Sequence, residues 1–270
     1  FLEGQGIFAF GGFTQRRSGN PGEVPMPFFS RRIGIDSDGH AVPILGGGRL
    51  TGRVGQYSIG IVNIQTKQDE VLGQSATNFA VLRVRRDILR RSNVGLMVVN
   101  RSAYGEKLRG NQAYGVDGVF SFFQNLNINT FLARTHTPEL RGDDRSYRAQ
   151  LEYNADRYGL VMEDLLVGRN FNPETGYVRR KDIRRNMAEF RFSPRPASSS
   201  VVRKYEFAAG VDRYSRASDG SLETQVVEAT YGIEFESSGG LGFDGYPLST
   251  VGSHITLRGN YIHGRPQDFG

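Results

Sequence analysis

Hydrophobic and polar residues alternate along most of this chain with a period of two, the spacing that places successive side chains on opposite faces of a β-strand. Residues 145–155 show the pattern clearly. One register is apolar and holds Tyr147, Ala149, Leu151 and Tyr153, whereas the other is polar and holds Ser146, Arg148, Gln150, Glu152 and Asn154. This segment is therefore predicted to be a strand with one apolar and one polar face.

The same alternation recurs along the chain. It predicts strands over residues 47–55, 56–67, 78–88, 92–103, 111–123, 126–137, 145–155, 158–168, 183–193, 201–215, 222–236 and 253–263. No stretch of useful length has the 3.6-residue period of an amphipathic helix. We therefore predict an all-β protein, an antiparallel up-and-down sheet with about twelve strands.

Short and long connections alternate between these strands. The connections near residues 55–56, 89–91, 124–125 and 156–157 are tight, and those at 68–77, 104–110, 138–144 and 169–182 are longer. Outer-membrane β-barrels have short turns at one end and longer loops at the other. The strands are also long enough for the roughly 9–11 residues that a tilted strand needs to cross a bilayer. Residues 237–252 depart from this rule, because they form a long link where a short one is expected.

Composition leaves two kinds of β protein open. Hydrophobic residues make up 38% of the chain, and no segment approaches the roughly 18 apolar residues of a membrane-spanning helix. Rows of arginine and glutamate with interspersed glycine suit the lumen of a transmembrane barrel, so we favour the barrel, and a soluble β-sandwich is the alternative. The chain has no Trp, so Tyr and Phe would have to supply the interfacial aromatic girdles of a barrel.

Charge and cysteine content exclude several functions. The net charge is +6, but arginines recur beside glutamates and aspartates, which indicates a mixed-charge surface rather than a nucleic-acid site. The absence of cysteine removes disulfides, thiolate chemistry and cysteine-based zinc sites.

The polar registers supply the candidate binding residues. We predict that a lumen or substrate path is lined by Arg148, Gln150, Glu152, Glu206, Asp212, Glu228, Glu234 and Arg258. The connection 169–182 carries a basic cluster, Arg179, Arg180 and Lys181, which could bind an acidic glycan or the phosphates of lipopolysaccharide. A structured loop near anionic headgroups is the plainer interpretation of this cluster.

Catalytic and metal signals are weak, so we predict no enzyme activity, no metal and no cofactor. The histidines His40, His136, His254 and His263 are scattered. A hydrolase could use Ser253, His254 and Asp144, but nothing in the sequence brings them together. Residues 36–39 are an Asp/Gly turn rather than a calcium loop, and the glycines at 46–48 are a flexible approach to the first strand rather than a phosphate loop.

Several blocks of the sequence resemble one family of bacterial proteins. They include Phe28-Phe29-Ser30-Arg31-Arg32-Ile33-Gly34, Arg90-Arg91-Ser92-Asn93-Val94-Gly95, Tyr114-Gly115-Val116-Asp117-Gly118, Phe171-Asn172-Pro173-Glu174 and Phe192-Ser193-Pro194-Arg195-Pro196. In that family a carbohydrate-binding family 9-like domain precedes a domain of unknown function that is taken to be an outer-membrane β-barrel. The likeness covers roughly residues 1–236 and concerns the barrel part alone.

The resemblance implies location, partners and task. It implies a bacterial outer membrane, contact with membrane lipid and lipopolysaccharide, and truncation at both ends, so that further strands or partner proteins complete the assembly. Residues 1–46 would be a linker or plug and residues 47–270 the barrel domain. We expect passage or surface handling of a glycan-derived substrate. A non-transporting scaffold that anchors partners is the first alternative, and a soluble sandwich or a barrel-borne hydrolase is a more distant one.

Overall fold

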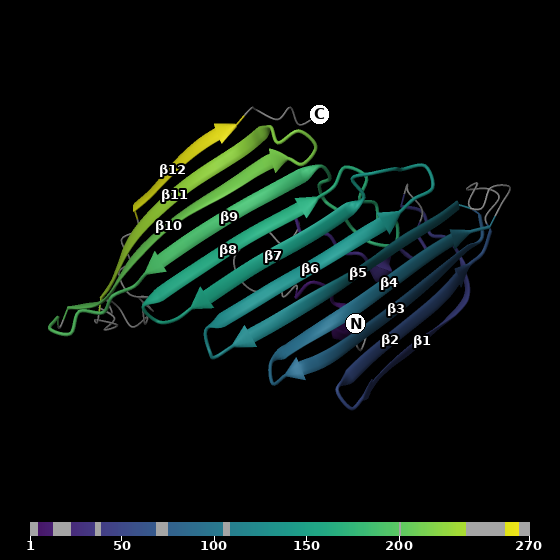
Figure 1. Ribbon diagram of the computed structural model, residues 1–270, viewed down its shortest axis with the longest axis horizontal. Coiled ribbons are helices and arrows are strands. Elements are labelled where there is room, and N and C mark those ends of the chain that lie inside the picture. Colours follow the sequence, from purple (N-terminus) through teal and green to yellow (C-terminus); the bar gives the residue numbers. More distant parts are fainter. Residues whose placement is uncertain are drawn as a thin grey trace, which may run out of the picture.

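The strands form a single sheet (Figure 1). The computed structural model describes residues 5–12, 23–35, 39–68, 75–104, 109–199, 201–235 and 257–264, without the side chains of residues 5, 109, 235 and 257–264. The strands are β1 (Ile44–Val54), β2 (Tyr57–Thr66), β3 (Thr77–Leu89), β4 (Ser92–Ala103), β5 (Arg109–Phe122), β6 (Leu126–His136), β7 (Arg145–Asn154), β8 (Tyr158–Val167), β9 (Ile183–Phe192), β10 (Val202–Arg216), β11 (Leu222–Phe235) and β12 (Leu257–Gly264). Two short 3-10 helices, η1 (Gln5–Phe8) and η2 (Ser30–Arg32), precede them.

The predicted all-β, antiparallel up-and-down topology is confirmed. Each strand pairs with its neighbours in sequence, in the order β1 to β12. Strand β1 begins at Ile44, so the glycines at 46–48 belong to the ladder rather than to a flexible approach, and a register shift falls between Ile44 and Gly46. Strands β1 and β12 are the two edges, so closure into a barrel is not seen in the described part of the chain.

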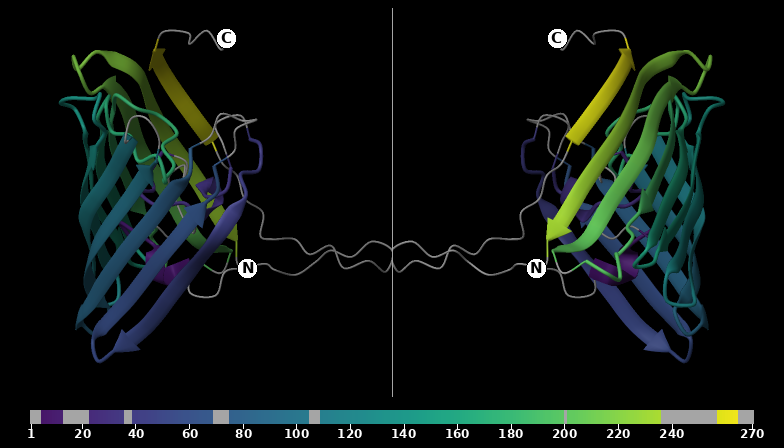
Figure 2. Two further views of the ribbon diagram at one scale, coloured as in Figure 1. Left: turned by 90° about the vertical axis from the view of Figure 1, so that its right-hand side faces the viewer. Right: turned by 90° about the vertical axis from the view of Figure 1, so that its left-hand side faces the viewer.

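The sheet curls along its width, and the N-terminal helices lie inside the curve (Figure 2). We call the enclosed side the concave face and the other side the convex face. Strand β7 places Ser146, Arg148 and Gln150 on the concave face, where they are 0%, 7% and 8% exposed. Its apolar register faces outward, with Tyr153 38% exposed. The polar side of this strand is therefore the buried one.

Neighbouring strands repeat this inversion. On the convex face, Leu96, Val116 and Leu132 of β4, β5 and β6 are 42%, 52% and 54% exposed. A β-sandwich in water would bury such residues and expose the polar register. Here the period-two pattern is kept, but the apolar side is left uncovered.

The concave face is covered by the chain itself. The rings of Phe10, from the segment after η1, and Phe131 of β6 have centroids 5.5 Å apart. Phe171, from the connection between β8 and β9, is completely buried. These aromatic residues join an apolar cluster with Val81, Met97, Ala113 and Leu165 of the sheet. None of the helices among the described residues is both long and apolar enough to cross a membrane.

Candidate functional site on the concave face

A buried ion pair links β3 and β5 on the concave face. The guanidinium of Arg83 donates through Nη1 and Nη2 to the two carboxylate oxygens of Asp117, the second at 2.8 Å. The two side chains are only 1% and 2% exposed. Between them, on β4, lies Gly95, where an added Cβ would stand 2.4 Å from Arg83 Nη1 and 2.6 Å from Asp117 Oδ1. The missing side chain of Gly95 is what lets the pair form across the intervening strand.

The same pair holds the N-terminal segment against the sheet. Arg83 Nη2 donates to the carbonyl oxygen of Ala9 at 2.9 Å, and the backbone N–H of Gly11 donates to Asp117 Oδ2 at 3.0 Å. The guanidinium also lies over the ring of Phe10, 5.5 Å from its centroid. Residues 9–11 are thus fixed by both members of the pair. Such hydrogen bonds offset the cost of burying the two charges. They leave Arg83 Nε as the one polar atom of this guanidinium that is buried without a hydrogen-bond partner in the described part of the chain.

A second charged network crosses four strands. Arg148 of β7 donates to Glu163 of β8, with Nε at 2.7 Å from Oε2. Arg185 of β9 donates to the other oxygen of Glu163 at 3.0 Å and to both oxygens of Asp212 of β10 at 2.8 and 2.7 Å. Two guanidinium groups therefore meet two carboxylates, and the network has no net charge. Arrays of this kind line the inner wall of polar β-barrels.

The connection between β8 and β9 folds back over the concave face. The side-chain amide of Asn111 of β5 makes two hydrogen bonds to the backbone of this connection. Nδ2 donates to the carbonyl oxygen of Asn172 at 2.8 Å, and Oδ1 accepts from the N–H of Glu174 at 3.1 Å. Arg101 of β4 forms an ion pair with Glu174 at 2.7 Å. This connection is therefore part of the filling of the curve rather than a freely projecting loop.

The predicted basic cluster of this connection is only partly available for binding. Arg180 is paired with Glu223 at 2.7 Å, and Lys181 Nζ donates to Asn172 Oδ1 at 2.8 Å. Burial lowers the pKa of Lys181, and the negative charge of Glu174 acts in the opposite direction. Arg179 is 47% exposed and lies 3.9 Å from Glu23. No contact in the structure tests the prediction that these residues bind a glycan or lipopolysaccharide.

The predicted lumen residues fall in the concave register wherever their side chains are described. Arg148 and Asp212 belong to the four-strand network, and Gln150 accepts from Asn129 at 3.1 Å. Glu206 and Glu234 are 38% and 37% exposed, with Lys204 and Arg203 as partners at 3.8 and 3.1 Å. Glu152 and Glu228 are half-buried. The side chain of Arg258 lies outside the described residues.

The sequence analysis missed Asp117, Glu163, Arg185 and Asn111. Each occupies the same period-two register as the predicted lumen residues of its sheet, which is the signal that could have found them. The alternation within one strand does not single these residues out; they stand out as charged rows that cross neighbouring strands.

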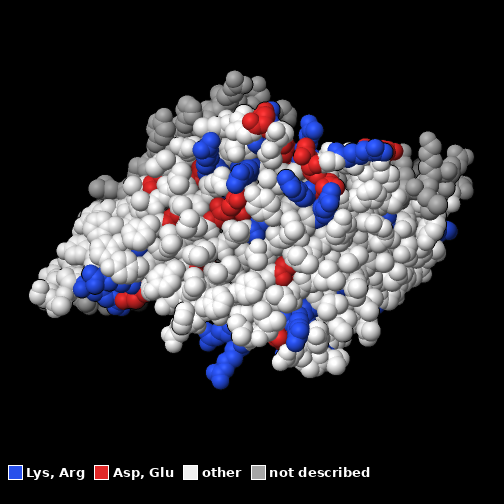
Figure 3. Space-filling view, in the orientation of Figure 1, with Lys and Arg blue, Asp and Glu red and all other residues white. Residues whose placement is uncertain are grey.

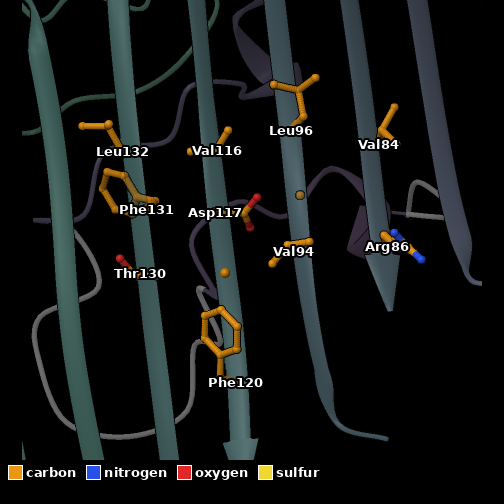
Figure 4. Close-up of a pocket in the computed structure, with 12 residues that line it drawn as sticks. Val84, Arg86, Val94, Leu96, Val116, Asp117, Phe120, Thr130, Phe131 and Leu132 are labelled. Carbon is orange, nitrogen blue, oxygen red and sulfur yellow. The ribbon is translucent and has the colours of Figure 1, made fainter. Parts of the chain in front are cut away.

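The convex face carries a shallow groove of about 510 Å³ over β3 to β6 (Figure 4). Val84, Leu96, Val116 and Leu132 form its apolar floor and walls. The ring of Phe120 lies over Gly118, where an added Cβ would be 2.6 Å from the ring. The groove is thus a mainly apolar feature of the uncovered side, although Arg86 and Asp117 also belong to its lining.

The geometry brings no catalytic constellation together in the described residues. Ser253 and His254 lie outside them, and the carboxylate of Asp144 is engaged by Arg134 at 3.0 and 3.3 Å. Within the described part of the chain no three metal-binding side chains gather. The Asp/Gly turn at 36–39 also falls largely on residues outside the description.

Comparison with known proteins adds no relative. A scan against models of protein families gives no match, and a search of curated proteins gives none either. The resemblance to the family with a carbohydrate-binding family 9-like domain is therefore untested and stays a prediction.

Proposed function

We propose that this chain forms the membrane-spanning wall of an outer-membrane β-barrel whose lumen is occluded by its own N-terminal segment and by the connection between β8 and β9. The observation that carries the proposal is the inverted pattern of the sheet. Charged and polar rows are buried on the concave face, and apolar rows are exposed on the convex face. Lipid is the solvent in which that arrangement leaves no apolar surface in contact with water.

Aromatic residues on the convex face support the same proposal. Tyr158, Phe192, Phe207 and Tyr231 occupy one rung of β8 to β11, with successive ring centroids 5.3, 6.2 and 5.0 Å apart. Arg157 lies over the first two rings at 5.7 and 5.5 Å. Aromatic rows with nearby cations are typical of the interface between hydrocarbon and water. In this chain Tyr and Phe take the place of the missing Trp.

The distance between the aromatic row and the arginine near the other end of β9 fits a bilayer. Arg184 lies eight residues before Phe192, which is about 26 Å along the strand. A strand tilt of about 40° reduces this to roughly 20 Å, close to the apolar band of about 25 Å that barrels present to lipid. Figure 3 shows charged atoms gathered toward the upper and lower margins of this face, with a mainly uncharged surface between them.

Single cysteines along β7 test the membrane assignment, because the native chain has none to interfere. A polarity-sensitive probe at positions 147, 149, 151 and 153 should report hydrocarbon in vesicles, and at 146, 148 and 150 it should report a polar environment. Equal polarity for both registers, or recovery of the chain without detergent or lipid, would overturn the proposal.

Passage of glycan-derived solutes is a second candidate for the concave face. It is favoured by the half-exposed carboxylates Glu206 and Glu234, which are suited to hydrogen bonding with hydroxyl-rich solutes. A scaffold is favoured by the paired charges that fix the inner segments. Conductance across a planar bilayer that contains the protein distinguishes passage from a scaffold. Stable currents that depend on the solute would support passage, and the absence of current would support the scaffold.

A further inference from the structure

We propose that the convex face of β6 to β10 holds a binding site for a phosphate-bearing lipid. The site is a cluster that we call the arginine patch, formed by Arg134, Arg145, Arg184 and Arg213 together with Asp144 and Asp164. The inference rests on the proposed membrane-spanning function and adds to it a specific ligand class and its residues.

The strand register brings these residues together. Arg134 of β6 and Arg145 of β7 are directly opposite each other in the antiparallel ladder. On the next strands, Leu166 of β8 pairs with both Tyr147 of β7 and Arg184 of β9. Like charges that face each other across a ladder are destabilising. Asp144 supplies a counter-charge to Arg134, so Arg145 is the member of this rung that calls for a further anion.

Both carboxylates of the patch already accept hydrogen bonds from neighbouring side chains. Asp144 accepts two hydrogen bonds from Arg134. Asp164 accepts from Arg184 at 3.1 and 3.2 Å, from Tyr147 Oη at 3.1 Å and from Asn186 Nδ2 at 2.9 Å. With four guanidinium groups and two carboxylates, the patch keeps an excess of two positive charges.

That excess lies on Arg145 and Arg213. Both side chains are exposed, and neither forms an ion pair or side-chain hydrogen bond with any described residue. Arg213 is paired in the ladder with Asn186, beside Asp164. The ladder places Arg213 three strands from Arg145 and four residues further along the strand direction, with Asp164 and Arg184 between them. Each guanidinium can bind phosphate oxygens through two parallel N–H donors, so either arginine can hold the phosphate of a bound lipid.

The surroundings favour a lipid as the source of the phosphate. Leu132, two residues from Arg134 on the same face of β6, lines the apolar groove of the convex face. Two residues of strand span about 7 Å, so the groove opens next to the patch. A molecule with phosphate at one end and an acyl chain at the other would contact both. Figure 3 shows the charged atoms toward the upper margin of this face, bordered below by uncharged surface.

The test uses the full chain in vesicles of phosphatidylcholine that contain a minor fraction of phosphatidic acid. After extraction in mild detergent, native mass spectrometry counts the retained lipid. The wild type should retain phosphatidic acid in preference to phosphatidylcholine, and the double substitution Arg145→Gln with Arg213→Gln should reduce that retention at least fivefold. The conservative double substitution Arg145→Lys with Arg213→Lys should recover part of it.

A matched control keeps the result specific. Arg90→Gln with Arg91→Gln removes the same charge from the turn between β3 and β4, at the opposite end of the sheet, and should leave retention unchanged. Equal retention in wild type and the Gln variant of the patch would overturn the proposal. Displacement of the lipid by inorganic phosphate at equal concentration would also overturn it, in favour of a free-phosphate site. Failure of the wild type to enter vesicles would instead refute the membrane-spanning function itself.

Discussion

Met26 and Tyr177 exchange two backbone hydrogen bonds, at 2.9 and 2.8 Å, although one precedes the sheet and the other lies between β8 and β9. Phe29 N–H adds a third, to the carbonyl oxygen of Thr175 at 2.9 Å. At Gly176 an added Cβ would be 2.1 Å from the carbonyl oxygen of Met26, so the two segments approach as closely as backbones can. The two elements that fill the concave face therefore form one unit, and a change that releases one is expected to loosen the other.

The ion pair of Arg83 and Asp117 is the attachment of that unit to the sheet. Replacing both charges with apolar residues, Arg83→Met with Asp117→Leu, removes the bonds to Ala9 and Gly11 without leaving a buried charge unpaired. We expect the sheet to unfold at a similar temperature and chymotrypsin to cleave at Phe8 and Phe10 at least tenfold faster. Unchanged cleavage would show that Phe10 and its aromatic contacts hold the segment alone.

The single substitution Asp117→Asn is the comparison for that experiment. It leaves the guanidinium of Arg83 buried without a counter-charge, and breaking a buried pair in this way costs about 3–5 kcal/mol. The free energy of unfolding should fall accordingly. If the single variant is as stable as the double variant, the pair does not behave as a desolvated unit.

Gly95 is predicted to be intolerant of the smallest side chain. A Cβ there would overlap both members of the pair, so Gly95→Ala should shift them and lower the free energy of unfolding by about 1–3 kcal/mol, the range for overpacking. Gly48→Ala in β1 is the matched control, because its added Cβ meets nothing within 4 Å. Denaturant unfolding of both variants measures the difference, and equal stability would contradict the argument.

How far the sequence predicts this structure differs between the sheet and its contents. Strand positions follow from the period of two, because each strand of this sheet has one apolar and one polar face, whichever of the two is enclosed. Which face is enclosed depends on the curl of the whole sheet and on the segments inside it. The N-terminal segment has no alternation, and its contact with Tyr177 joins residues far apart in sequence. Neither periodicity nor turn chemistry carries information about such a contact.

The charged network shows the same limit at the level of single residues. Arg148 and Asp212 could be assigned to the concave register by counting alternate positions. Their common connection through Glu163 and Arg185 could not, because Arg148 is paired in the ladder with Leu165 and Arg185 with Tyr214. The ion pairs run diagonally across the rungs, so they depend on exact register and tilt.

Glu163 is predicted to be the critical member of this network. It accepts from both Arg148 and Arg185 while only 3% exposed, so Glu163→Gln leaves the buried guanidinium of Arg148 with a neutral partner and leaves Arg185 to its pair with Asp212. We expect a loss of about 3–5 kcal/mol in the free energy of unfolding. Asp156→Asn breaks the exposed pair with Arg195 and should change stability by less than about 1 kcal/mol. Comparable losses in the two variants would show that burial does not strengthen the network.

The amine of Lys181 is predicted to lose its proton, and so to become reactive, at a lower pH than an ordinary lysine. Because burial lowers its pKa, a larger fraction of its amine is neutral at a given alkaline pH, and only the neutral amine reacts. The pH midpoint of its labelling rate by acetic anhydride, followed by peptide mass spectrometry, is therefore expected below the usual value of about 10.4. The variant Glu174→Gln removes the charge that raises the pKa, so the midpoint should move lower still. A midpoint in Glu174→Gln equal to or above that of the wild type would contradict the role assigned to the charge of Glu174.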